Sequence, residues 1–382
     1  MIFNGSERRP ERGPIHRPAF RFRTNPAWRV AGLSSFWFLA SLLVLGACAP
    51  RVQQPLNAHQ PPRLTDTHAV MRDGARLPLA TWAPAAPPRA ALVALHGFND
   101  HSGAFGDLGP TLAKDGVAVY AYDQRGFGGA PGRGIWPGAT ALGRDLAEVV
   151  RLVRAEHPGI PVHALGESMG GAVIMAALAG DARLEIDGAV LSAPAVWGRV
   201  TMPPWQRGTL AAATAAFPAI RLRPQGIKIT PSDNIEMLRA LGRDPRFIGE
   251  TRIDALSGLV DLMDRALEAS RTLRLPLLVL YGERDEIVPR RPTCLMLSRL
   301  PVPGSGRRWR AALYPRGYHM LFRDLAGDLV SRDIAAWLTD PAAALPSGHE
   351  RHPDKATGTP LPGFCPEPRP GATAQGMRPP SD

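Results

Sequence analysis

The stretch VHALGESMGG at residues 162–171 decides the fold. Its first four residues form an apolar run, GESMG at 166–170 follows, and an alanine-rich segment continues to Ala179. A strand, a sharp turn and a helix in this order hold a serine on a strained bend, where the glycines on both sides prevent steric clashes. The pattern predicts Ser168 as a nucleophile. An ordinary glycine-rich turn between a strand and a helix is the alternative.

Short apolar segments lie on both sides of this stretch and alternate with helical patterns. We expect strands at Ala90–Leu95, Val117–Tyr122, Val162–Leu165, Ala189–Leu191, Leu277–Tyr281 and Ala311–Tyr314. They are apolar at consecutive positions, as strands buried on both faces of a parallel sheet are. The alternation predicts an α/β fold with a doubly wound, mostly parallel sheet. Upstream, Ala69–Leu77 is broken by Asp73-Gly74, which predicts a hairpin.

Two further segments define the domain organisation. From about 196 to 270 the sequence has apolar helical runs and no convincing strand, which predicts a helical cap inserted into a domain that spans 64–340. Residues 341–382 are rich in Pro and Gly with mixed charge, and we expect a disordered tail there.

Two later strand ends supply partners for the serine, whose hydroxyl needs a base at neutral pH. Asp285 follows the strand expected at 277–281, and His319 follows the one at 311–314. The carboxyl ends of parallel strands open on one crevice, so we expect Ser168, Asp285 and His319 to meet there. His319 would take the serine proton and Asp285 would orient the imidazole. The rival candidates are Glu283 for the acid and His349 or His352 for the base, although the two histidines fall in the expected tail.

A tetrahedral intermediate also needs hydrogen-bond donors for its oxyanion. The backbone N–H of Met169, directly after the nucleophile, is the first candidate. The second is the N–H of Phe98 in the sequence HGF at 96–98, because Gly97 lets the backbone approach closely. His96 could also act as a base, but we interpret it as a structural histidine of this loop.

The N-terminus resembles an export signal. Its first 30 residues hold seven Arg against two Glu, and the apolar segment Ala31–Leu45 follows. The sequence LGAC at 45–48 resembles the lipobox of bacterial lipoproteins, which implies a signal peptide over 1–48, lipidation of Cys48 and a flexible tether over 49–63. An uncleaved membrane anchor, or ordinary cleavage beside an incidental Cys, are the alternatives. All three place the catalytic part outside the cytoplasm of a bacterium, and Ala49 after the Cys favours the outer membrane.

Composition limits the partners and cofactors. The net charge is +11, of which the first 30 residues contribute +5, and no basic helix indicates nucleic acid. No close pair of cysteines suggests a metal or redox motif, and no metal or nucleotide cofactor is implied. The sequence leaves open whether Cys294 and Cys365 pair, and the expected disorder of the tail argues against it.

Several motifs together resemble the monoacylglycerol lipase and lysophospholipase group of α/β hydrolases, which includes the S33-type serine aminopeptidases. The likeness runs from about 64 to 338 and covers LHGFNDHSG at 95–103, YDQRG at 122–126, GESMGG at 166–171, LSAP at 191–194, YGERD at 281–285, GYHML at 317–321 and Asp244-Pro245 in the cap. The chain departs from the family at FGG, 127–129, where His-Gly and a Ser usually follow.

The resemblance implies an α/β-hydrolase fold, a triad of Ser168, Asp285 and His319, and oxyanion donors at Phe98 and Met169. It implies a serine hydrolase for esters with an apolar acyl chain, such as monoacylglycerol or lysophospholipid. Apolar cap residues would line the acyl pocket, and the alternative for many of them is that they only pack the cap onto the core. An acyltransferase or peptidase with the same triad, or an inactive surface lipoprotein that binds lipid, are the alternatives. The head group, the chain length and the oligomeric state are not defined by the sequence.

Overall fold

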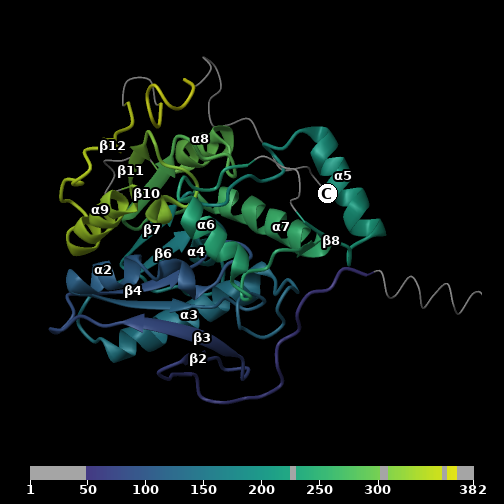
Figure 1. The fold of residues 1–382 in the computed structure, drawn as a ribbon, viewed down its shortest axis with the longest axis horizontal. Coiled ribbons are helices and arrows are strands. Elements are labelled where there is room, and N and C mark those ends of the chain that lie inside the picture. The colour runs from purple at the N-terminus through teal and green to yellow at the C-terminus, as the bar shows by residue number, and fades with distance from the viewer. Residues whose placement is uncertain (1–48, 224–228, 302–308, 355–358, 368–382) are drawn as a thin grey trace, which may run out of the picture. The chain divides into compact units, whose positions relative to one another are not determined.

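The computed structural model describes residues 49–223, 229–301, 309–354 and 359–367. Ten strands form a sheet in the order β1-β2-β3-β5-β4-β6-β7-β10-β11-β12 (Figure 1). The strands are β1 Arg63–Leu64, β2 His68–Val70, β3 Arg76–Trp82, β4 Ala90–Leu95, β5 Val117–Tyr122, β6 Val162–Glu167, β7 Gly188–Ser192, β10 Leu277–Gly282, β11 Trp309–Tyr314 and β12 Glu350–Arg351. The six central strands, β5, β4, β6, β7, β10 and β11, run parallel to one another. At the two edges of the sheet, β1 to β3 and β12 pair antiparallel with their neighbours.

Helices cover both faces of the sheet (Figure 1). One face is covered by α3 Ala139–Glu156, α4 Met169–Ala179, α7 Ile253–Ala269 and α8 Arg290–Arg299, and the other by α2 Leu108–Lys114 and α9 Gly327–Thr339. Strand β4 is apolar throughout because both of its faces are buried. Ala91, Val93 and Leu95 pack into the core beneath α3, α4, α7 and α8, while Leu92 and Ala94 pack into the core beneath α2 and α9. The doubly wound, mostly parallel α/β sheet predicted from the sequence is confirmed.

The predicted strands form at the predicted places. β4 and β5 have the expected bounds, while β6 extends to Glu167 and β10 to Gly282, each by the residues that lead into a site loop. The predicted hairpin is the β2–β3 pair. Its turn contains Gly74 at a φ of +88°, a conformation that residues with a Cβ rarely adopt.

The segment from about 196 to 270, which was expected to form the cap, divides between two locations. Helices α5 Pro204–Ala216 and α6 Ile235–Arg243 lie outside the two helix layers that cover the sheet. The two-residue strands β8 Arg221–Leu222, after α5, and β9 Thr251–Arg252, before α7, pair with each other in antiparallel fashion. Helix α7 packs along α4 and belongs to the layer over the sheet (Figure 1). The apolar side chains of both segments look alike in sequence, and only the packing partner separates them.

The expectation of a disordered tail from 341 is wrong for 341–354 and 359–367. Strand β12 pairs with β11, whose outer edge would otherwise carry unpaired backbone groups. Leu345, Leu361 and Phe364 are buried. Cys365 forms a disulfide with Cys294 of α8, with the two Cα atoms 5.5 Å apart, so the argument against pairing is corrected as well. A few apolar residues and one cross-link are enough to order a segment that is otherwise rich in Pro and Gly.

The segment 49–63 was expected to be a flexible tether, and it instead follows the surface of the domain. The Arg51 N–H donates to Asp254 at 3.0 Å, and the Gln53 N–H donates to the Trp136 carbonyl at 2.9 Å. The signal peptide and Cys48 lie outside the described residues. Among the helices that the structure describes, none combines the length and the apolar character that crossing a membrane requires.

Candidate active site

Ser168 lies on the bend between β6 and α4 and has an unusual backbone conformation. Its φ is 51° and its ψ is −112°, a region that costs energy for a residue with a side chain. The bend is held because the Ser168 N–H donates to the Ser192 carbonyl and the Ser168 carbonyl accepts from the Ala195 N–H, both at 2.9 Å. A Cβ at Gly166 would lie 2.3 Å from the Gly170 backbone carbon, so a glycine is required there. The predicted strand–turn–helix at this serine is confirmed.

His319 and Asp285 meet across two loops, after β11 and β10 respectively. The distance from His319 Nδ1 to Asp285 Oδ2 is 2.8 Å. The other carboxylate oxygen accepts from the N–H groups of Ile287 at 2.8 Å and Val288 at 2.9 Å, which fixes the carboxylate. Burial alone would lower the pKa of His319, but the charges of Asp285 and Glu167 outweigh it, so the pKa is raised.

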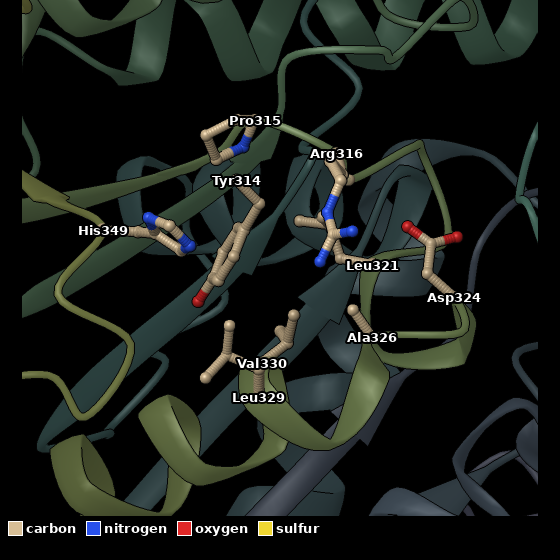
Figure 2. A pocket seen from close by; sticks show the side chains of 10 residues that line it. Tyr314, Pro315, Arg316, Leu321, Asp324, Ala326, Leu329, Val330 and His349 are labelled. Atoms are coloured by element: carbon tan, nitrogen blue, oxygen red, sulfur yellow. The ribbon is translucent and has the colours of Figure 1, made fainter.

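The rival residues lie in other surroundings. Glu283 is exposed, and His352 has 74% of its side chain exposed beside Glu350. His349 packs on the ring of Tyr314 in a separate pocket of about 170 Å³ (Figure 2). His96 is fully buried: its Nε2 accepts from the Gln124 N–H at 2.9 Å, which supports a structural role in the loop.

Ser168 and His319 line one pocket of about 460 Å³. Much of its wall is apolar: Trp197, Ile229, Phe247, Leu259, Met263, Ile287 and Val288. Of the apolar residues in the segment expected to form the cap, Trp197, Leu259 and Met263 line the pocket. Leu262 is buried in the core, while Trp205 and Phe217 are exposed. The expectation that cap residues line the pocket holds for some of them only.

The two predicted oxyanion donors flank the serine. Phe98 lines the pocket, and Met169 is the first residue of α4. The loop comes close to the bend, since a Cβ at Gly97 would lie 3.5 Å from Ser168 Cβ. Neither N–H has a hydrogen-bond acceptor within the part of the chain that the structure describes. Both groups are therefore free of backbone partners there, and their oxyanion role remains a prediction.

A buried charged cluster beside the serine was missed in the sequence. Arg323 lies 2.8 Å from Asp100 Oδ2 through Nη1 and 2.7 Å from Glu167 Oε2 through Nη2, and all three side chains line the pocket. The sequence does contain one indication of this cluster. Glu167 is the residue directly before the serine, at the end of a strand expected to be buried, and it carries a charge. A carboxylate buried there requires a cation.

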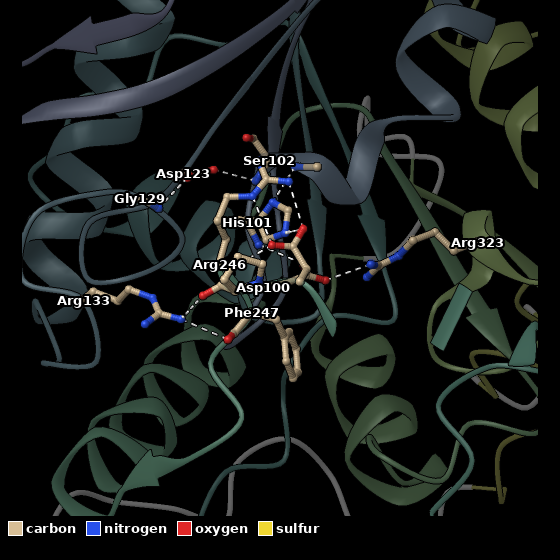
Figure 3. A network of polar contacts seen from close by, with 12 residues as sticks. Asp100, His101, Ser102, Asp123, Gly129, Arg133, Arg246, Phe247 and Arg323 are labelled. Atoms are coloured by element: carbon tan, nitrogen blue, oxygen red, sulfur yellow. Dashed lines mark hydrogen bonds and ion pairs between the residues drawn. The ribbon is translucent and has the colours of Figure 1, made fainter. Parts of the chain in front are cut away.

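The cap is fastened to the loop that carries Phe98 (Figure 3). The Ile248 N–H donates to the Asn99 carbonyl at 2.9 Å, and His101 Nε2 lies 3.1 Å from Asp244 Oδ2. Arg133 donates to the Phe247 carbonyl at 3.0 Å. The Asp244-Pro245 motif noted in the sequence therefore marks the contact between the cap and this loop.

The sheet and the bend at Ser168 are those of an α/β hydrolase, and comparison with known proteins gives the family. A model of the family described as Serine aminopeptidase, S33 matches residues 86–326. The chain belongs to this family. Among the described residues, no group of three or more His, Cys, Asp or Glu side chains is arranged to hold a metal ion.

Curated relatives and solved structures agree with this membership. The chain is 27% identical to a monoacylglycerol lipase of Mycolicibacterium smegmatis, over 69% of this chain and 93% of the relative, and 26% identical to the human monoglyceride lipase, over 72% and 91%. The crystal structure of a soluble variant of the Saccharomyces cerevisiae monoglyceride lipase, in complex with a substrate analog, shares the fold with a TM-score of 0.60, 23% identity and coverage of 75% and 100%. The protein is a carboxylic ester hydrolase.

Proposed function

We propose that the protein cleaves carboxylic esters with a single apolar acyl chain, of the monoacylglycerol or lysophospholipid type, through Ser168, Asp285 and His319. The observation that carries the proposal is the His319–Asp285 contact of 2.8 Å, in a pocket that His319 shares with the strained Ser168. The names of the lipase relatives support the substrate class.

The reaction follows from the position of each group. His319 removes the proton from the Ser168 hydroxyl, whose oxygen attacks the ester carbonyl. The N–H groups of Phe98 and Met169 stabilise the oxyanion of the tetrahedral intermediate. The intermediate collapses to an acyl-enzyme as His319 returns the proton to the departing alcohol. Water, deprotonated by His319, then releases the acid and restores Ser168.

The apolar wall supports an acyl chain as the bound group. Trp197, Leu259 and Met263 offer hydrocarbon surface next to the serine, where burial of a chain removes apolar area from water. The charged residues Asp100, Glu167 and Arg323 line the same pocket. A pocket with both kinds of wall favours an ester with one apolar part and one polar part.

The decisive experiment is hydrolysis of p-nitrophenyl esters of increasing chain length by the wild type and by Ser168→Ala. We expect Ser168→Ala to retain less than about a thousandth of the wild-type rate. Ser298→Ala, at an exposed serine of α8, is the matched control and should keep the full rate. A Ser168→Ala protein with near wild-type activity, or a folded wild type inactive on every ester, contradicts the proposal.

We also propose that the protein is exported and anchored in the bacterial envelope by a lipid on Cys48. The Cys294–Cys365 disulfide supports export, because disulfides persist in oxidising compartments. Labelling of expressing cells with a radioactive fatty acid tests the anchor. We expect label on the wild type and none on Cys48→Ala, and equal labelling of both would contradict the anchor at this residue.

A further inference from the structure

The charged cluster joins three loops that carry the reacting groups. Arg323 ends the short helix η2, Leu321–Arg323, and lies four residues after His319. Glu167 immediately precedes Ser168, and Asp100 lies two residues after Phe98. Arg323 belongs to the histidine loop, and its guanidinium contacts Glu167 at the serine bend. The same guanidinium contacts Asp100 of the oxyanion loop (Figure 3).

We propose that Arg323 is a positioning residue, which fixes these three loops relative to one another and keeps the negative charge of Glu167 beside His319. The inference rests on the proposed function. It adds Arg323, which would affect the reaction only by holding the triad and the oxyanion donors in place. Arginine suits this task because its planar fork can hold two carboxylates in fixed directions.

A purely stabilising role explains the cluster poorly. Its three side chains are buried, with exposed fractions of 1% for Glu167, 2% for Asp100 and 8% for Arg323. Buried ion pairs often contribute no more to stability than apolar side chains of similar size, because desolvation opposes the attraction. Two carboxylates also face one cation, so one negative charge is left over when both are ionised. Burial raises the pKa of Glu167, and the charge of Arg323 opposes this by favouring the ionised form.

That charge acts on His319. The charged groups facing His319 are Asp285 from the loop after β10, Glu167 from β6 and Arg323 from η2. Burial lowers the pKa of His319, Asp285 and Glu167 raise it, and Arg323 lowers it, with a raised pKa as the net result. A raised pKa means that the imidazolium formed when His319 takes the serine proton is stabilised.

The chain contains a matched control. Arg125, after β5, is also buried and also joins two carboxylates: its Nη1 lies 2.7 Å from Asp73 Oδ2 and its Nη2 lies 2.8 Å from Asp145 Oδ1. These partners belong to the β2–β3 turn and to α3, and neither Arg125 nor its partners line the pocket of Ser168. A substitution there tests the loss of an ion cluster whose members make no ion pair with the three loops.

The experiment compares the pH dependence of kcat/KM on p-nitrophenyl butyrate. His319 must be neutral to accept the proton, so activity rises with pH through its pKa. Glu167→Gln is nearly isosteric and removes one negative charge, which lowers the pKa of His319. We therefore expect the acid limb of the pH profile, where kcat/KM rises with pH, to move to lower pH. We also expect Arg323→Lys to lower kcat about a hundred-fold with KM little changed, as misplaced catalytic groups do.

The control and a neutral variant complete the test. Arg125→Lys should lower the urea midpoint of unfolding and leave kcat and the acid limb unchanged. The triple variant Asp100→Asn, Glu167→Gln, Arg323→Met carries no charge in the cluster and remains informative if Arg323→Lys does not fold. We expect it to have a reduced kcat and an acid limb shifted to lower pH.

The outcomes separate this inference from the proposed function. An active wild type with an unshifted acid limb in Glu167→Gln, or a triple variant with wild-type kcat, would overturn the positioning role alone. A folded wild type with no esterase activity would overturn the proposed function and this inference together.

Discussion

Helices α7 and α5 come from one stretch of sequence, in which both carry apolar residues and both were expected in the cap. Along α7, Leu262 and Ala266 are fully buried against the core, while Met263 lines the pocket. Every residue of α5 keeps part of its surface exposed, and Trp205 is 69% exposed. The difference shows that apolar content predicts a helix here but not its role, which depends on the element that it packs against.

The largest expected effect is on the core side of α7. Leu262 is fully buried, so Leu262→Ala leaves a cavity in the core. We expect this substitution to lower the free energy of unfolding by about 2–5 kcal/mol. Urea unfolding followed by circular dichroism measures this change. The corresponding α5 variant, Trp205→Ala, should change the free energy of unfolding by less than about 0.5 kcal/mol. Equal losses in both would remove the distinction between the two helices.

The pocket side of α7 is expected to control chain length. Met263→Trp fills part of the apolar wall, so kcat/KM for a long-chain p-nitrophenyl ester should fall about ten-fold relative to the butyrate. Arg265→Trp, at an exposed position of the same helix, is the control and should keep the ratio. An unchanged ratio in Met263→Trp would mean that the acyl chain binds elsewhere.

The smallest expected effect is on the exposed face of α5. Trp205→Ser should lower binding to phosphatidylcholine vesicles by about three-fold, because exposed tryptophans favour the interface between water and lipid. Co-sedimentation of a protein that spans residues 49–382 with vesicles measures this binding independently of the N-terminal segment. Arg207→Ser, at another exposed position of α5, serves as the control. Unaltered binding of Trp205→Ser would exclude this side chain from lipid contact.

Much of the fold was predictable because it depends on local patterns. The parallel strands are short, continuous apolar segments, and the bend at Ser168 requires glycines at fixed positions. The order of Ser168, Asp285 and His319 along the chain placed each at the carboxyl end of a strand, so their approach followed from the sheet alone.

The features that were missed depend on contacts between distant residues. The segment 359–367 is ordered by the Cys294–Cys365 link and by Phe364, which packs on Tyr281, and neither partner can be read from local composition. The Arg323 cluster joins Asp100, Glu167 and Arg323 over more than two hundred residues of sequence. The role of α7 was missed because its spacing fits both a cap helix and a helix over the sheet.

The role of Ser168 as nucleophile is tested by reacting the folded protein with a fluorophosphonate and mapping the modified residue by mass spectrometry. We expect a single stoichiometric adduct on Ser168, formed more slowly as the pH falls through the raised pKa of His319. An adduct on another serine, or an unmodified Ser168 in folded protein at neutral pH, would contradict it.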